Sequence, residues 1–202
     1  MNIVCLDLEG VLVPEIWIAF AEKTGIEALR RTTREEPDYD KLMRYRMGIL
    51  REHGLTLKDI QNVIAEIRPL EGAKEFLDKL RERTQVIILS DTFSEFAAPL
   101  MKQLGWPTIF CNSLEVDGND MICGIRMRQD NGKKKAIDGL RAMGFRTFAA
   151  GDSYNDLAMI HLADKGCLFR APENIIKEEP DLRLCRTYDE FYSEIESFID
   201  EE

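Results

Sequence analysis

Residues 3–10 read Ile-Val-Cys-Leu-Asp-Leu-Glu-Gly, and residues 147–156 read Thr-Phe-Ala-Ala-Gly-Asp-Ser-Tyr-Asn-Asp. Each stretch is a short apolar run that stops at acidic side chains. A run of this length without helical spacing is typical of a strand buried on both faces of a sheet. Open α/β folds place their sites at the carboxyl edge of such strands. We therefore expect the two acidic tips to meet there, hold one hard cation and act on an anionic substrate.

Further apolar runs of strand length alternate with helical patterns along the chain. The predicted strands are residues 3–6, 86–89, 108–111, 147–150 and 167–169. Between and after them, apolar residues recur with the i, i+3, i+4, i+7 spacing of amphipathic helices. This alternation predicts an α/β fold, with a Rossmann-like parallel sheet that carries helices on both faces.

Residues 14–69 interrupt the alternation, because they show three helical patterns and no convincing buried strand. We expect a small helical cap subdomain here, inserted after the first strand. Residues 1–13 and 70–202 would then form the catalytic α/β core. A second interruption, at residues 110–128, alternates in polarity around an Asp-Gly-Asn-Asp turn and predicts a β-hairpin.

Composition excludes several classes of protein. A net charge of −10 over 202 residues argues against nucleic acid as the main partner. No apolar stretch approaches the roughly 20 residues that span a bilayer. Five scattered cysteines predict reduced thiols in a cytoplasmic protein, and neither they nor the two histidines have zinc-site spacing. The sequence leaves the oligomeric state open, a homodimer included.

Asp7 is open to several interpretations: a helix cap, a salt-bridge partner, a metal ligand or a nucleophile. Its neighbours favour chemistry. Glu9 follows two residues on, Gly10 frees the backbone to turn, and Asp152 and Asp156 form a second acidic tip. Carboxylates crowded into one crevice repel one another unless a cation neutralises them, and an all-oxygen ligand set suits Mg²⁺.

Four segments, in the correct order, resemble the signature motifs of the haloacid-dehalogenase-like phosphohydrolases. The segments are Asp7-Leu8-Glu9-Gly10-Val11-Leu12, Ile87-Ile88-Leu89-Ser90, Lys133 at the start of a helix, and Gly151-Asp152-Ser153-Tyr154-Asn155-Asp156. Each motif alone is unspecific. Their order over residues 7–156 is what carries the resemblance.

The resemblance implies a role for each motif. Asp7 would attack phosphorus and form an aspartyl-phosphate. Mg²⁺ would be held by Asp7, the backbone carbonyl of Glu9, and Asp152, with Asp156 near its shell.

Ser90 and Lys133 would hold the other phosphoryl oxygens. Ser90 has an alternative as the N-cap of a helix that starts near Phe93. Lys133 stands in a Lys-Lys-Lys run, so Lys134 is an alternative phosphate-binding lysine.

Glu9 departs from the family pattern, which has Asp at this position. In the family that residue protonates the leaving alcohol and then activates water. Glutamate is longer by one methylene and reaches differently. The longer arm would disfavour attack by water on the aspartyl-phosphate and leave room for an alcohol acceptor.

The order of cap, hairpin and lysine resembles the phosphoserine phosphatase branch of this family. In that branch a cap glutamate binds the substrate amino group and a cap arginine binds its carboxylate. The matching residues are Glu15 and Arg46, and a carboxylate and an arginine fork suit these groups. The alternative for Arg46 is an ordinary surface position on a helix.

Within the branch, residues 7–15 and 90–93 look most like a subgroup described as both phosphoserine phosphatase and phosphoserine:homoserine phosphotransferase. There the phosphoryl group passes to homoserine as well as to water. Asp91 and Thr92 would line the attack position, or would cap a helix instead. The fourth motif adds Asn155 to the substrate-binding set.

Other functions remain as alternatives. The first is a phosphatase for another small metabolite, such as a sugar or nucleotide phosphate, in which Glu15 and Arg46 would be unimportant. More remote are a phospho-receiver domain and a family member kept for binding alone. A receiver carries its acceptor aspartate near residue 50 and has no cap, and the intact Asp7 argues against a binding-only role.

Overall fold

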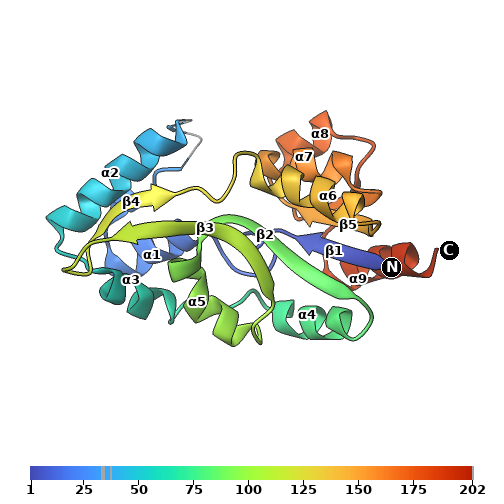
Figure 1. The fold of residues 1–202 in the computed structure, drawn as a ribbon, viewed down its shortest axis with the longest axis horizontal. Helices are drawn as coiled ribbons and strands as arrows, with labels where there is room; N and C mark the ends of the chain where they lie inside the picture. Colours follow the sequence, from blue (N-terminus) through green and yellow to red (C-terminus); the bar gives the residue numbers. More distant parts are fainter. Residues whose placement is uncertain (33–34, 37, 202) are drawn as a thin grey trace.

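The computed structural model of the protein describes residues 1–32, 35–36 and 38–201. These residues form a seven-stranded sheet in the order β4-β3-β2-β1-β5-β6-β7 (Figure 1). The strands are β1 (Asn2–Leu6), β2 (Gln85–Phe93), β3 (Thr108–Val116), β4 (Ile122–Arg126), β5 (Arg146–Gly151), β6 (Lys165–Phe169) and β7 (Arg183–Cys185). All neighbouring strands are parallel except β3 and β4, which form the predicted antiparallel hairpin.

Helices cover both faces of this sheet. They are α1 (Ile16–Thr24), the 3₁₀ helix η1 (Glu27–Arg30), α2 (Tyr39–Glu52), α3 (Leu57–Ile64), α4 (Ala73–Arg81), α5 (Ser94–Gln103), α6 (Gly132–Ala142), α7 (Tyr154–Leu162), α8 (Glu173–Glu178) and α9 (Tyr188–Asp200). Helices α6, α7 and α8 lie on the upper face in Figure 1, and α4, α5 and α9 on the lower face. The α/β architecture predicted from the alternating pattern is confirmed.

Strand β1 shows why the apolar runs form the centre of the sheet. Successive side chains of a strand point to opposite faces. Val4 and Leu6 pack in the core under α4, α5 and α9, whereas Ile3 and Cys5 pack in the core under α6, α7 and α8. A strand between two helical layers must therefore be apolar at every position, and its first polar residue marks the edge of the sheet.

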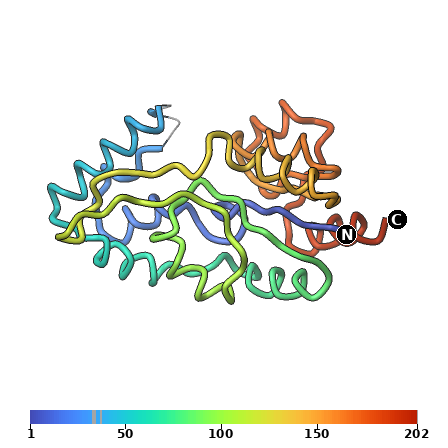
Figure 2. The backbone as a smooth tube through the Cα atoms, in the orientation of Figure 1, coloured from blue at the N-terminus to red at the C-terminus, as the bar shows by residue number. Residues whose placement is uncertain are grey.

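The inserted helices α1 to α3 lie around the far end of the β3–β4 hairpin. In Figures 1 and 2, α2 lies on one side of the hairpin and α1 and α3 lie on the other. The hairpin turn also holds the start of α3, because Asp120 accepts hydrogen bonds from Leu57 N through its carbonyl (2.7 Å) and from Lys58 N through its carboxylate (2.9 Å). The described helices include none that is long and apolar enough to cross a membrane.

The structure differs from the sequence-based expectation at the end of the second strand. Strand β2 runs to Phe93, not to residue 89, because Phe93 pairs with Asn112 on β3 beyond an irregularity in register. Helix α5 therefore begins at Ser94, with Phe93 as its N-cap residue. The alternative roles of Ser90, Asp91 and Thr92 as helix caps are wrong, since all three belong to the strand.

Candidate active site

Two acidic strand ends meet at the carboxyl edge of the sheet, as the sequence predicted. Strands β1 and β5 are direct neighbours, and Asp7 N donates to the carbonyl of Ala150 (3.0 Å), which continues their pairing past the end of β1. Asp152 follows β5, and Asp156 lies one helical turn later, in α7. Each of the three carboxylates offers an oxygen within 4.8 Å of the others. This cluster is the centre of the candidate site.

Gly10 allows the loop after β1 to approach Asp152. Its φ is +74°, in the left-handed region, and an added Cβ would lie 2.2 Å from Asp152 Oδ2. A side chain here would be both strained and in collision with a carboxylate. The turn closes through hydrogen bonds from Gly10 N to Val13 O (2.8 Å) and from Val13 N to Leu8 O (3.0 Å). The glycine therefore sets how near the first loop comes to the second acidic tip.

Asp156 is fully buried and uses both of its carboxylate oxygens. Oδ2 accepts hydrogen bonds from Ser153 N (3.0 Å), Ser153 Oγ (3.0 Å) and Asp152 N (3.1 Å). The bond from Ser153 N is part of the capping box at the start of α7. Oδ1 accepts from Lys133 Nζ (2.7 Å). One side chain thus ends the strand-to-helix turn and fixes the lysine.

Lys133 is the lysine that reaches the strand ends. Its side chain is 6% exposed, and Nζ lies 2.9 Å from Asp7 Oδ1 and 2.7 Å from Asp156 Oδ1. Lys134, one residue later on α6, is exposed, so it is not the lysine of this site. Burial alone would lower the pKa of Lys133, but the carboxylates of Asp156 and Asp7 outweigh burial and raise it. Lys133 is therefore a cation at all physiological pH values.

The carboxylates carry more negative charge than one ammonium balances. Burial and the neighbouring Asp156 raise the pKa of Asp7, although Lys133 opposes them. Burial, then Asp156 and Glu15, raise the pKa of Asp152 to about 7. Such shifts arise where like charges share a desolvated site, and a divalent cation would reverse them. The carboxylates of Asp7, Asp152 and Asp156 together form an all-oxygen donor set that fits a hard metal ion.

Two further residues stand at the end of β2, next to the end of β1. Ser90 is buried, and its Oγ accepts a hydrogen bond from Thr92 N (3.2 Å). Asp91 is partly exposed and accepts a hydrogen bond from Asn155 Nδ2 (2.8 Å), and it lies 3.8 Å from Lys133 Nζ. The second, third and fourth motifs therefore meet around Asp91.

The Glu9 side chain contacts the start of α1, the first of the inserted helices. Its Oε2 accepts a hydrogen bond from Ile16 N (2.8 Å), the first residue of α1. Burial, then the charge of Glu15, raise the pKa of Glu9 to about 8. Glu9 is therefore largely protonated at neutral pH.

Arg46 is buried on α2, so the alternative of an ordinary surface position is wrong. It is 6% exposed, and its hydrogen bonds go to cap residues: from Nη2 to Arg31 O (2.8 Å) and from Nη1 to Met43 Sδ (3.8 Å). Burial lowers the pKa of Arg46 to about 10, although Tyr39, Glu9 and Glu15 act in the opposite direction.

Two aromatic residues on the inserted helices, Trp17 on α1 and Tyr39 on α2, were not singled out by the sequence. The Trp17 ring lies against the Arg46 guanidinium, with 4.4 Å between the ring centroid and Cζ. Tyr39 packs against the core that lies under α4, α5 and α9. Burial raises the pKa of Tyr39, although the charge of Arg46 acts in the opposite direction. A seven-residue spacing puts Tyr39 and Arg46 on one face of α2, and this spacing could have indicated from the sequence that the two residues lie together. Trp17 had no such signal, because it read as an ordinary apolar helix residue.

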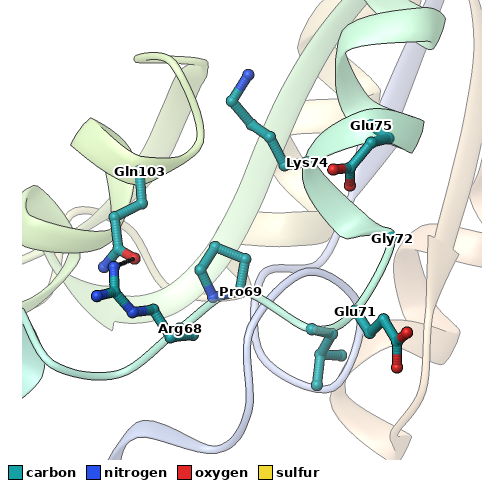
Figure 3. A pocket seen from close by; sticks show the side chains of 8 residues that line it. Arg68, Pro69, Glu71, Gly72, Lys74, Glu75 and Gln103 are labelled. Carbon is teal, nitrogen blue, oxygen red and sulfur yellow. Dashed lines mark hydrogen bonds between the residues drawn. The ribbon is translucent and has the colours of Figure 1, made fainter.

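A separate cavity, with a volume of about 520 Å³, lies along the hinge segment, residues 68–72, which joins the inserted helices to α4. It is lined by Arg68, Pro69, Leu70, Glu71, Gly72, Lys74, Glu75 and Gln103 (Figure 3). Arg68 Nη1 donates to Gln103 Oε1 (3.3 Å), and Gln103 Nε2 donates to Ile67 O (2.8 Å). No residue of the strand-end cluster lines it, so we treat it as the outer surface of the hinge and not as the reaction site.

Comparisons with known proteins agree with this geometry. The sequence pattern of the haloacid dehalogenase-like hydrolases matches residues 5–161. The phosphoserine phosphatase ThrH of Pseudomonas aeruginosa is 58% identical over 194 residues, which cover 96% of this chain and 95% of that protein. The phosphoserine phosphatase of Pseudomonas syringae pv. tomato is 57% identical over 194 residues, covering 96% of this chain and 82% of that protein.

Among solved structures, a substrate-bound phosphoserine phosphatase complex matches with a TM-score of 0.77 at 22% identity, over 95% of this chain and 97% of that one. A phosphoserine phosphatase in its apo form matches with a TM-score of 0.73 at 23% identity, over 91% of this chain and 92% of that one. At this level of identity, the likeness establishes a shared fold.

Proposed function

This chain belongs to the haloacid dehalogenase-like hydrolases, and from that membership we propose that it hydrolyses O-phospho-L-serine through an aspartyl-phosphate on Asp7. The observation that carries the chemistry is the Asp7 carboxylate at a strand end, 2.9 Å from a buried lysine ammonium. A nucleophile and a phosphate-binding cation need this proximity. The choice of substrate is supported by the two relatives at 57% and 58% identity, both named phosphoserine phosphatases.

The first half-reaction uses the strand-end residues. An Asp7 oxygen attacks phosphorus, the new Asp7 O–P bond forms, and the bond from phosphorus to the serine oxygen breaks. Lys133 and Ser90 hold phosphoryl oxygens while this happens. Asp7, the backbone carbonyl of Glu9, and Asp152 would hold Mg²⁺, with Asp156 behind them. When bound, the ion offsets the repulsion between carboxylate and phosphate dianion.

Glu9 supplies the proton that the leaving group needs. A pKa of about 8 keeps it protonated at neutral pH, which suits a general acid. Its proton passes to the serine oxygen as that bond breaks. Glu9 then takes a proton from water, the water oxygen bonds to phosphorus, and the Asp7 O–P bond breaks to release phosphate. A homoserine hydroxyl in place of water would give phosphohomoserine by the same step.

Glu9→Asp is expected to shift the balance from transfer toward hydrolysis. The shorter arm restores room for water beside the aspartyl-phosphate and moves the carboxyl group away from a bulkier alcohol. We expect the ratio of phosphate to phosphohomoserine to rise by roughly an order of magnitude, part of the 100-fold or more that a placed acid–base group contributes. The measurement is product analysis with O-phospho-L-serine and L-homoserine. An unchanged ratio would remove Glu9 from the account of acceptor choice.

The cap supplies recognition of the amino acid. We assign residues 14–69 to this cap and residues 1–13 and 70–202 to the catalytic core. Glu15 would pair with the substrate ammonium and Arg46 with its carboxylate, because planar guanidinium and carboxylate groups form paired hydrogen bonds. The buried position of Arg46 supports this role, since a guanidinium hidden from water needs an anionic partner.

Arg46→Ala is expected to raise the KM for O-phospho-L-serine on the order of 100-fold, the value of a charge-assisted contact. The KM for p-nitrophenyl phosphate, which has no carboxylate, should change little. Steady-state kinetics with both substrates makes the comparison. Equal effects on the two substrates would show that Arg46 supports the cap and does not read the carboxylate.

The proposed function is tested by phosphate release from O-phospho-L-serine with Mg²⁺, with and without L-homoserine, beside a panel of sugar and nucleotide phosphates. Preference for phosphoserine supports the assignment, and phosphohomoserine in the presence of acceptor adds the transferase activity. Preference for a sugar or nucleotide phosphate would keep Asp7 as the nucleophile and discard the assignment of Glu15 and Arg46.

A further inference from the structure

The Arg46 guanidinium is held from one face and has an unused edge. Its face lies over the Trp17 ring, with Cζ 4.4 Å from the ring centroid. Its two Nη atoms donate to Arg31 O and Met43 Sδ. Among the described residues, Nε has no hydrogen-bond partner, although it is buried. A guanidinium has five N–H donors in one plane, so stacking on its face uses none of them, and the Nε donor stays available.

Trp17 in turn is fixed by the catalytic core. Its ring meets Phe96 of α5 edge to face at 5.4 Å between centroids, with an interplanar angle of 71°. Phe96 meets Phe93, the last residue of β2, at 5.8 Å and 88°. The indole of Trp17 therefore connects Arg46 on the cap to the strand that carries Ser90 and Asp91.

An arginine that binds a substrate carboxylate must present the same edge of its guanidinium to every substrate molecule, although its side chain has many rotamers. Hydrogen bonds alone would fix it by using the donors that the substrate needs. A stacking aromatic ring fixes the plane without using a donor. Such contacts are worth more when they are shielded from water, and here Arg46 is buried and Trp17 is half-buried.

We propose that Trp17 is a positioning residue for Arg46, which holds the guanidinium plane so that the unused Nε edge takes the substrate carboxylate. Trp17 thereby sets the preference for substrates that carry a carboxylate beside the phosphate ester. This inference rests on the proposed function, because it assumes that Arg46 binds that carboxylate.

The test compares O-phospho-L-serine with O-phosphoethanolamine, which keeps the ammonium and the phosphate but lacks the carboxylate. For Trp17→Leu, we expect the KM for phosphoserine to rise on the order of 10-fold, with kcat nearly unchanged and phosphoethanolamine little affected. Trp17→Phe, which keeps an aromatic face, should restore most of the loss. Trp106→Phe is the matched control, because Trp106 is 65% exposed and is the chain's other tryptophan.

Two results would overturn the proposal. If Trp17→Leu raised the KM equally for both substrates, Trp17 would have only a structural role. If it raised neither KM, the stack on Arg46 would have no role in substrate binding. In an Arg46→Ala background, Trp17→Leu should add nothing, whereas additive losses would show that the two residues act independently.

A second measurement does not depend on turnover. In the Trp106→Phe variant, Trp17 is the sole tryptophan, so its emission reports the stack. Arg46→Ala should change that emission in the absence of substrate, and an unchanged spectrum would refute the contact. If the unmodified enzyme does not prefer phosphoserine over phosphoethanolamine, the proposed substrate is wrong, and so is the role of Trp17 in carboxylate binding. The emission measurement still tests the contact between Trp17 and Arg46 in that case.

Discussion

Asp7→Asn is expected to lower turnover of O-phospho-L-serine by a factor of about 10⁴ or more, the scale seen when a catalytic nucleophile is removed. The amide is close in shape to the carboxylate and can still accept the hydrogen bond that Leu8 N donates to Asp7 Oδ1 (2.8 Å). It carries no charge and does not attack phosphorus. The fold should persist, because the substitution also relieves repulsion among three crowded carboxylates.

Phosphate release measures the rate, and the mass of acid-quenched protein measures the aspartyl-phosphate. Asp138→Asn is the matched control, because Asp138 is an exposed carboxylate on α6. It should keep full activity and form the phosphoprotein. A phosphoprotein still formed by the asparagine variant would carry its phosphoryl group on another residue and would exclude Asp7 as the nucleophile.

Lys133→Met should produce the second large loss, about 10³-fold in kcat/KM, because it removes the fixed positive charge that faces the transferring phosphoryl group. The change should also reduce the free energy of unfolding. Lys133 Nζ stands between Asp7 and Asp156, both buried. Removing one member of a buried ionic cluster leaves the others uncompensated and typically costs about 3–5 kcal/mol.

The lysine run offers its own control for this variant. Lys134 is exposed on the same helix, so Lys134→Met should leave both activity and the free energy of unfolding nearly unchanged. Denaturant unfolding and phosphatase kinetics, measured on both variants, show which of the two lysines supports activity and stability. If Lys134→Met lost as much activity as Lys133→Met, the assignment of the phosphate-binding lysine would be wrong.

The parts of the fold that sequence predicted well are those governed by local periodicity. The central strands had to be apolar throughout, and their ends were marked by acidic residues. Even the choice between Lys133 and Lys134 had a local signal: Lys133 precedes Ile137 by four residues and Leu140 by seven, and all three lie on the buried face of α6.

The parts that sequence did not predict depend on pairing between distant segments. Strand β2 continues to Phe93 because β3 supplies a partner at Asn112, and no property of residues 90–93 alone reports that partner. In the same way, the stack of Trp17 on Arg46 joins α1 to α2, across 29 positions of sequence. Such contacts follow from the packing of the cap, which local patterns do not determine.

The double use of Asp120 has a practical consequence for protein engineering. A hairpin turn that contains Asp, Gly and Asn is usually the first place chosen for an inserted epitope or reporter, because loop tips tolerate added chain. Here that turn accepts the first backbone hydrogen bonds of α3 through both its carbonyl and its carboxylate. An insertion there would loosen a helix that belongs to the cap. The turn at Met143 and Gly144, where Met143 is 67% exposed, leaves those hydrogen bonds untouched and is the better graft point.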